Sequence, residues 1–107
     1  MFASVLITTP DLESAEKICS TLIEKRLVAC ANYFPTRSMY RWGGKVDSNE
    51  EFIIILKIRS ADFKEISEEI SKLHPYDLPC IVKYDISEGL QPYLDWIRES
   101  TNRPPED

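Results

Sequence analysis

The chain has 107 residues, 43% of them hydrophobic and 29% charged, with a formal net charge of −5. This composition is typical of a single globular domain and excludes a fibrous or disordered chain. The negative balance argues against nucleic acid as a partner, and no apolar run approaches the roughly 20 residues needed to span a membrane.

The three cysteines, Cys19, Cys30 and Cys80, are odd in number and widely spaced. They form no Cys-x-x-Cys pair, which disfavours a zinc knuckle or a thioredoxin-type site. The apolar N-terminus lacks a basic leading segment and is expected to be a strand rather than a signal peptide. Reduced thiols and a cytoplasmic location are the simplest expectation.

Strand and helix patterns alternate along the first part of the chain. Residues 2–8 are apolar and rich in strand-forming types, which predicts a strand. Pro10 and Asp11 open a segment whose apolar residues recur at helical spacing, which predicts an amphipathic helix. Residues 28–42 predict a second strand, in which Pro35 implies a bulge or an edge position.

Two turn signals, Gly43-Gly44 and Asp47-Ser48-Asn49, place the apex of a hairpin within residues 43–50. Residues 51–59 are strongly strand-forming and predict its second arm. The remaining predicted elements are a helix that begins at Ser60 and Asp62 and is stopped by Pro75, a strand over residues 78–86, and a short helix after Gly89.

The element order is therefore β-α-β-β-α-β-α, and its first six members follow the ferredoxin-like order. We expect an α+β protein, a ferredoxin-like βαββαβ sandwich with a long central hairpin and a short C-terminal helix. Residues 1–101 are expected to form a single domain, and residues 102–107 a frayed C-terminal tail.

Apolar side chains on both faces of the third strand indicate that the protein is not a monomer. Alternation places Ile54 on one face and Ile53 and Ile55 on the other, whereas the helices of this architecture cover only one face. A strand over residues 28–42 would also extend about 45–50 Å and overhang its own sheet. Closed symmetric assembly satisfies such strand edges. The alternative is that Pro35 bends the hairpin back on itself.

Few residues are able to carry chemistry. His74, at the end of the second predicted helix, either interacts with the helix dipole or acts as a metal ligand or in proton transfer. Packing is favoured for Cys30 and Cys80, although Cys80 and His74 could share a site. Glu51 is by default solvated. It also lies with Lys57 on a partly apolar strand face, where it could be an ion-pair partner or a ligand.

The aromatic residues are more ordinary, and packing is the favoured interpretation for most of Tyr40, Trp42, Tyr76, Tyr93 and Trp96. The sequence contains no Gly-rich phosphate loop, Ser-His-Asp arrangement or His-Glu-x-x-His motif. We therefore do not expect an enzyme.

Four motifs spread along the chain carry a family resemblance. They are Ala29-Cys30-Ala31-Asn32, Ser38-x-Tyr40-x-Trp42-x-Gly44-Lys45, His74-Pro75-Tyr76-Asp77-Leu78-Pro79 and Tyr93-Leu94-x-Trp96-Ile97. Together they resemble the signature blocks of the CutA divalent-cation tolerance family, in family order and over about residues 3–101. Each motif is weak alone, but four of them at the right separations are specific.

The resemblance implies a ferredoxin-like homotrimer, similar in architecture to PII signalling proteins, in which long hairpins pair strands between subunits. It also implies tolerance of divalent metals, copper above all, and binding of such ions. Cys30, Glu51 and His74 match family positions proposed to face a cleft between subunits, and thiolate, imidazole and carboxylate together suit copper. The resemblance assigns five further positions to the lining of that cleft: Tyr40, Trp42, Lys45, Lys57 and Tyr76.

Two departures from the family pattern bear on metal preference. Cys80 stands where the family often has a glutamate, and Asp77 replaces a commoner glutamate. A PII-like signalling protein that binds a small metabolite or a partner protein is the alternative function, because a polar and aromatic cluster at an interface needs no metal. An enzyme, such as an acylphosphatase on the same fold, is the least favoured, since fold does not imply function.

Overall fold

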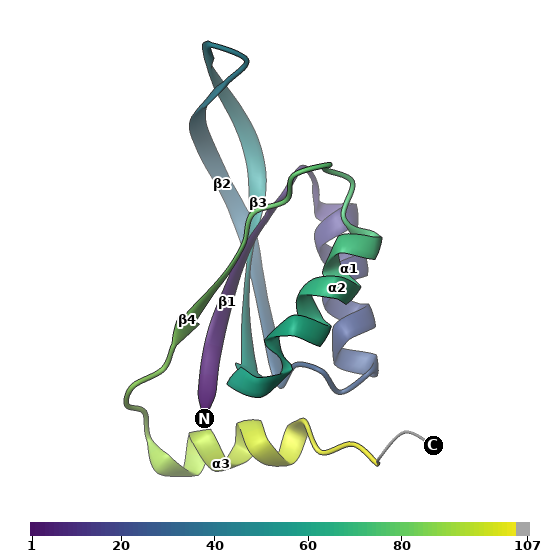
Figure 1. Cartoon of the computed structure of the whole chain (residues 1–107), viewed down its shortest axis with the longest axis vertical. Coiled ribbons are helices and arrows are strands. Elements are labelled where there is room, and N and C mark those ends of the chain that lie inside the picture. Colours follow the sequence, from purple (N-terminus) through teal and green to yellow (C-terminus); the bar gives the residue numbers. More distant parts are fainter. Residues whose placement is uncertain (105–107) are drawn as a thin grey trace.

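The part of the chain that the computed structural model describes, residues 1–104, forms one antiparallel sheet with two helices on one face (Figure 1). The strands are β1 (Phe2–Thr9), β2 (Cys30–Trp42), β3 (Lys45–Arg59) and β4 (Ile81–Asp85), in the spatial order β2-β3-β1-β4. The helices are α1 (Leu12–Glu24), α2 (Phe63–Leu73) and α3 (Gln91–Ser100), and a 3₁₀ turn, η1 (Ser60–Asp62), precedes α2. The predicted α+β, ferredoxin-like architecture is confirmed.

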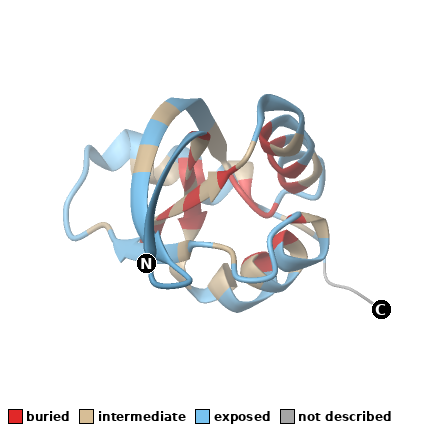
Figure 2. Cartoon of the chain, turned by 90° about the horizontal axis from the view of Figure 1, so that it is seen from above, coloured by how far each residue is buried: buried red, intermediate tan, exposed pale blue. Residues whose placement is uncertain are grey.

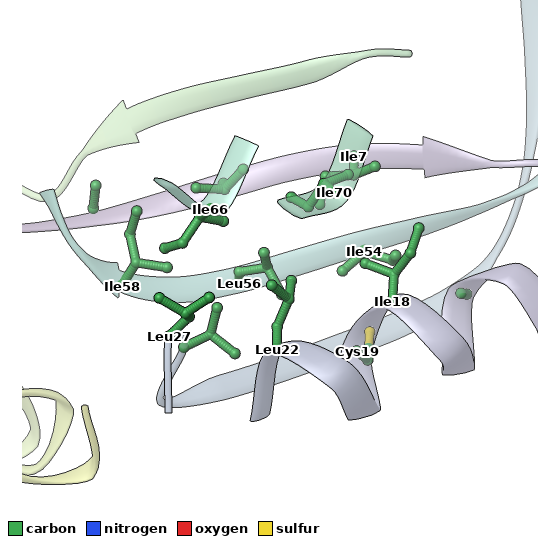
Figure 3. Packing of buried hydrophobic residues seen from close by; sticks show 14 residues of the cluster. Ile7, Ile18, Cys19, Leu22, Leu27, Ile54, Leu56, Ile58, Ile66 and Ile70 are labelled. Carbon is green, nitrogen blue, oxygen red and sulfur yellow. The ribbon is translucent and has the colours of Figure 1, made fainter. Parts of the chain in front are cut away.

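The core lies between the sheet and the pair α1 and α2, where buried residues concentrate (Figure 2). The side chains that meet there alternate along the strands and recur at helical spacing in the helices (Figure 3). Among them are Ile7, Ile54, Leu56 and Ile58 from the strands and Ile18, Leu22, Ile66 and Ile70 from the helices. Burying each such side chain contributes about 1.5–3 kcal/mol to folding.

The first helix begins where the sequence predicted. Asp11 is its N-cap, and the side chain accepts a hydrogen bond of 2.8 Å from the backbone N–H of Ser14. This hydrogen bond also lowers the pKa of the Asp11 carboxyl. The helix ends through Arg26, which adopts a left-handed conformation with φ of 57°. That conformation lets the next amide, of Leu27, bond back to the carbonyl of Leu22.

The hairpin turn lies at the start of the predicted range. Gly43 and Gly44 have φ of 59° and 79°, which only glycine adopts without strain, and two such residues form a two-residue hairpin turn. The second arm therefore begins at Lys45 rather than at residue 51. The fourth strand is shorter than predicted, because it starts at Ile81.

The register between β2 and β3 is continuous from Cys30 opposite Lys57 to Trp42 opposite Lys45. Pro35 lies opposite Phe52 within it, so it neither introduces a bulge nor bends the hairpin back. Its place on the edge strand β2 accounts for this, because an edge strand has positions whose N–H faces away from the neighbouring strand and is not needed for pairing.

The third helix runs across the end of the sheet at which β1 begins (Figure 1). Arg59 ties it there, donating to the Thr101 hydroxyl at 2.8 Å and to Asn102 at 2.7 Å. The Arg103 guanidinium donates to Arg26 O and pairs with Asp62. Asn102 and Arg103 therefore contact the body of the domain, and residues 105–107 of the expected tail lie outside the described residues. None of the helices in residues 1–104 is long and apolar enough to cross a membrane.

Candidate functional site

The hairpin overhangs the sheet, as its length predicted (Figure 1). Strand β1 pairs with β3 only from Phe52 to Arg59, so residues 45–51 of β3 pair only with residues 36–42 of β2. This overhang, residues 36–51, projects roughly 23 Å beyond the sheet at ~3.3 Å per residue. Most of its side chains are exposed.

The face of the sheet away from α1 and α2 is the second feature; we call it the open face. Ile55 lies on it between Leu6 of β1 and Asn32 of β2. Ile55 and Leu6 are half-buried, and Tyr84 of β4 on the same face is 55% exposed. The prediction that β3 carries apolar side chains on both faces is confirmed, because Ile54, the residue before Ile55, is fully buried on the side that faces the helices.

Strand alternation carries the open face onto the overhang and collects several predicted cleft residues there. Trp42 lies opposite Lys45, and Tyr40 lies opposite Asp47. The side-chain amide of Asn49 donates to the Tyr40 hydroxyl at 2.6 Å. Trp42 is 61% exposed, which is unusual for so large an apolar surface and leaves it free to contact another molecule.

Glu51 lies where the overhang leaves the sheet, and it is only 5% exposed. Its Oε2 accepts a hydrogen bond of 2.8 Å from the hydroxyl of Tyr76, in the loop between α2 and β4. The pKa of Tyr76 is raised to about 12, chiefly by burial and next by this hydrogen bond to the carboxylate. The solvated state expected by default for Glu51 is therefore wrong, because a loop remote in sequence folds over it.

His74 is 8% exposed. It follows the last residue of α2, and its backbone N–H donates to Ile70 O, which closes the C-terminus of that helix. Its Nε2 lies 2.8 Å from Thr8 O, and its Nδ1 accepts a hydrogen bond of 3.1 Å from the backbone N–H of Tyr76. His74 and Glu51 are thus both joined to Tyr76, one through its amide and the other through its hydroxyl.

Cys30 lies at the opposite end of the sheet. It pairs with Lys57, six residues along β3 from Glu51, which separates Cys30 and Glu51 by about 20 Å. Its thiol is 3.5 Å from the side-chain oxygen of Asn32. The pKa of the Tyr93 hydroxyl on α3 is raised chiefly by burial and next by the nearby Cys30 thiol. Cys30 is half-buried, so it is less enclosed than a core cysteine.

The other two thiols differ sharply. Cys19 is buried on the core face of α1, and burial raises its pKa to about 11. Cys80 is exposed, so the packing favoured for it is wrong. Strand β4 begins only at Ile81, and this leaves Cys80 in the preceding loop.

The structure therefore divides the predicted metal ligands of one chain. Glu51 and His74 lie near Tyr76, whereas Cys30 lies beside α3. Within residues 1–104, no three His, Cys, Asp or Glu side chains gather closely enough to hold a metal ion. The sequence gives no local signal for the bond between Tyr76 and Glu51, which are 25 residues apart.

The fold and these residues define a class: a small ferredoxin-like domain with an overhanging hairpin and a buried carboxylate at the base of the overhang. Residues 3–100 match the family model described as CutA1 divalent ion tolerance protein. The chain belongs to this CutA1 family.

Relatives cover most of the chain. It is 45% identical over 96 residues to a divalent-cation tolerance protein CutA of Archaeoglobus fulgidus, covering 90% of this chain and 94% of that one. It is 43% identical over 99 residues to that of Pyrococcus horikoshii, covering 92% and 97%. Human protein CutA is 30% identical over 92% of this chain and 56% of its own. The names of the two archaeal relatives refer to cation tolerance rather than to a catalysed reaction.

Solved structures agree with the fold. That of the periplasmic divalent cation tolerance protein CutA from Archaeoglobus fulgidus superimposes with a TM-score of 0.93 at 43% identity, covering 95% of this chain and 100% of that one. The Thermus thermophilus divalent cation tolerance protein gives a TM-score of 0.91 at 43% identity, covering 95% and 100%. The expectation of a cytoplasmic location is contradicted, because the Archaeoglobus protein is described as periplasmic.

Proposed function

We propose that the protein acts in divalent-cation tolerance as a homotrimer that binds divalent metal ions, copper foremost. The observation that carries the proposal is the overhang, residues 36–51, which has no strand partner among residues 1–104 beyond its two arms. Family membership and the names of the relatives support the cation. We propose no enzymatic step.

Two exposed surfaces of the subunit favour assembly, the overhang and the open face. The overhang exposes backbone edges that pair readily with another chain, and the open face carries half-buried apolar side chains such as Leu6 and Ile55. Rotational symmetry satisfies every copy of such a surface at once. A trimer places the overhang of each subunit against a neighbour.

Of the three ligands that the family resemblance implies, Cys30, Glu51 and His74, we propose that Cys30 and Glu51 bind the ion, and their binding depends on that assembly. Because Cys30 and Glu51 of one chain are about 20 Å apart along β3, they can share an ion only if different subunits supply them. Thiolate would supply the soft ligand that copper prefers, and the carboxylate would supply charge. The remaining cleft residues proposed are Tyr40, Trp42, Lys45, Lys57 and Tyr76.

Two measurements test the proposal. Light scattering of the chromatographed protein should give three times the mass of the chain, and titration calorimetry with Cu²⁺ should show saturable binding. We expect Glu51→Gln and Cys30→Ser to weaken Cu²⁺ binding about tenfold or more, while Cys80→Ser, an exposed thiol, serves as the control. A monomeric mass, or heats that do not saturate, would contradict the proposal.

A PII-like signalling role is the second candidate. It is favoured by the polar and aromatic set formed by Glu51 and Tyr76, with Tyr40 on the same face, which is satisfied by hydrogen bonds without a metal. Thermal-shift screening of metabolites would reveal a ligand as a raised melting temperature that Tyr40→Phe reduces. Uniformly flat responses would count against this role.

A further inference from the structure

We infer that His74 is a positioning residue for the Glu51 carboxylate, acting through Tyr76, and that it is not itself a metal ligand. The inference deepens the proposed function and rests on it only for the cation that Glu51 would bind. Its starting point is that both ring nitrogens of His74 are already hydrogen-bonded in a nearly closed environment.

The partners of the ring decide its tautomer. Thr8 offers a carbonyl oxygen, which can only accept, so Nε2 of His74 carries the hydrogen. Tyr76 offers a backbone N–H, which can only donate, so Nδ1 of His74 carries the lone pair. The imidazole is therefore neutral, in its Nε2–H form.

A metal ion needs a nitrogen lone pair from neutral imidazole. Nε2 has none in this tautomer, and the lone pair of Nδ1 is used by the Tyr76 amide at 3.1 Å. Coordination at either nitrogen would break a bond of a side chain that is 8% exposed and would leave a buried polar group without its partner.

The same two bonds give His74 a positioning function. Through Nε2 the ring is fixed to the end of β1, and through Nδ1 it fixes the backbone of Tyr76. From that backbone the Tyr76 hydroxyl reaches Oε2 of Glu51 at 2.8 Å. The orientation of the carboxylate at the base of the overhang therefore depends on His74 through two hydrogen bonds in series.

The chain contains one histidine, so ¹⁵N-labelled histidine gives a single pair of ring signals. We expect the metal-free protein to show the Nε2–H tautomer, and saturating Zn²⁺, monitored by calorimetry, to leave both nitrogen shifts unchanged. An Nδ1–H tautomer, or a large Zn²⁺-dependent shift of either nitrogen, would overturn the inference. If calorimetry shows no Zn²⁺ binding, the metal-free tautomer still decides the role of His74, and the Cu²⁺ titration decides the proposed function separately.

Variants provide a second readout. Asparagine places an oxygen acceptor near the position of Nδ1, whereas alanine places none, and neither supplies an imidazole ligand. We expect His74→Asn to retain Zn²⁺ affinity within about twofold and His74→Ala to lose about as much as Tyr76→Phe. Equal losses in His74→Asn and His74→Ala would contradict positioning of Tyr76 through the Nδ1 acceptor.

Discussion

The Tyr76 hydroxyl donates to Oε2 of Glu51 at 2.8 Å, joining the loop before β4 to the point where β3 leaves the sheet. The neighbouring Glu50 points to the other side of the hairpin, where it is exposed and pairs with Arg37 at 3.1 Å. Two consecutive glutamates thus have opposite environments, because strand alternation sends one under the loop and the other into solvent. Of these two glutamates, Glu51 is the one whose carboxylate is shielded from solvent.

Replacing Tyr76 by phenylalanine should remove the hydroxyl donor of a buried carboxylate. We expect the free energy of unfolding to fall by about 1–2 kcal/mol, since a hydrogen bond to a charged group in a closed site is lost. Denaturant titration at a fixed protein concentration measures this. The matched control is Tyr84→Phe, whose ring is 55% exposed. Equal effects of the two substitutions would contradict the role assigned to the Tyr76 hydroxyl.

Arg26 has φ of 57° just after α1, a conformation in which a side chain costs about 1 kcal/mol. Arg26→Gly should therefore leave stability unchanged or raise it slightly, because relief of this cost is partly offset by the greater freedom of glycine in the unfolded chain. Arg26→Val should destabilise, since a β-branched residue tolerates this conformation poorly. Thermal unfolding of both variants tests the pair, and a glycine variant less stable than the valine variant would refute the account.

The three cysteines should differ in reactivity. Burial, with a smaller contribution from the nearby Glu16, raises the pKa of Cys19 to about 11, so its thiolate is scarce at pH 8. Cys80 is exposed and should react first with a thiol reagent such as iodoacetamide. Mass spectrometry of peptides after a timed reaction ranks the sites. Modification of Cys19 in the folded protein as fast as that of Cys80 would show that the core around α1 opens readily.

Arg103 holds the segment after α3 to the body of the domain, pairing with Asp62 and donating to Arg26 O at 2.9 Å. Arg103→Ala should lower the free energy of unfolding by about 1 kcal/mol, since partly buried charge-assisted hydrogen bonds are lost. Hydrogen exchange should rise in α3 and not in α1. Lys17→Ala, at an exposed position of α1, is the control, and a uniform rise in exchange would point to global rather than local loosening.

Much of the fold was determined by local sequence patterns. The apolar periodicities of α1 and α2, the cap at Asp11 and the glycine pair at the hairpin tip each specify their element through interactions between near neighbours. The overhang was also predictable, because strand length is additive along the chain. The boundaries of β4 were not, since its edge pairing with β1 decides where that strand starts.

The candidate functional residues were likewise predictable only in part. The family resemblance singled out Cys30, Glu51 and His74, but residue types alone do not say which side chains lie together. The register of β2 and β3 separates Cys30 from Glu51, and the loop carrying Tyr76 buries Glu51 and occupies the ring of His74. Those relationships join residues far apart in the chain, and such contacts are set by how elements pack rather than by the sequence on either side of them.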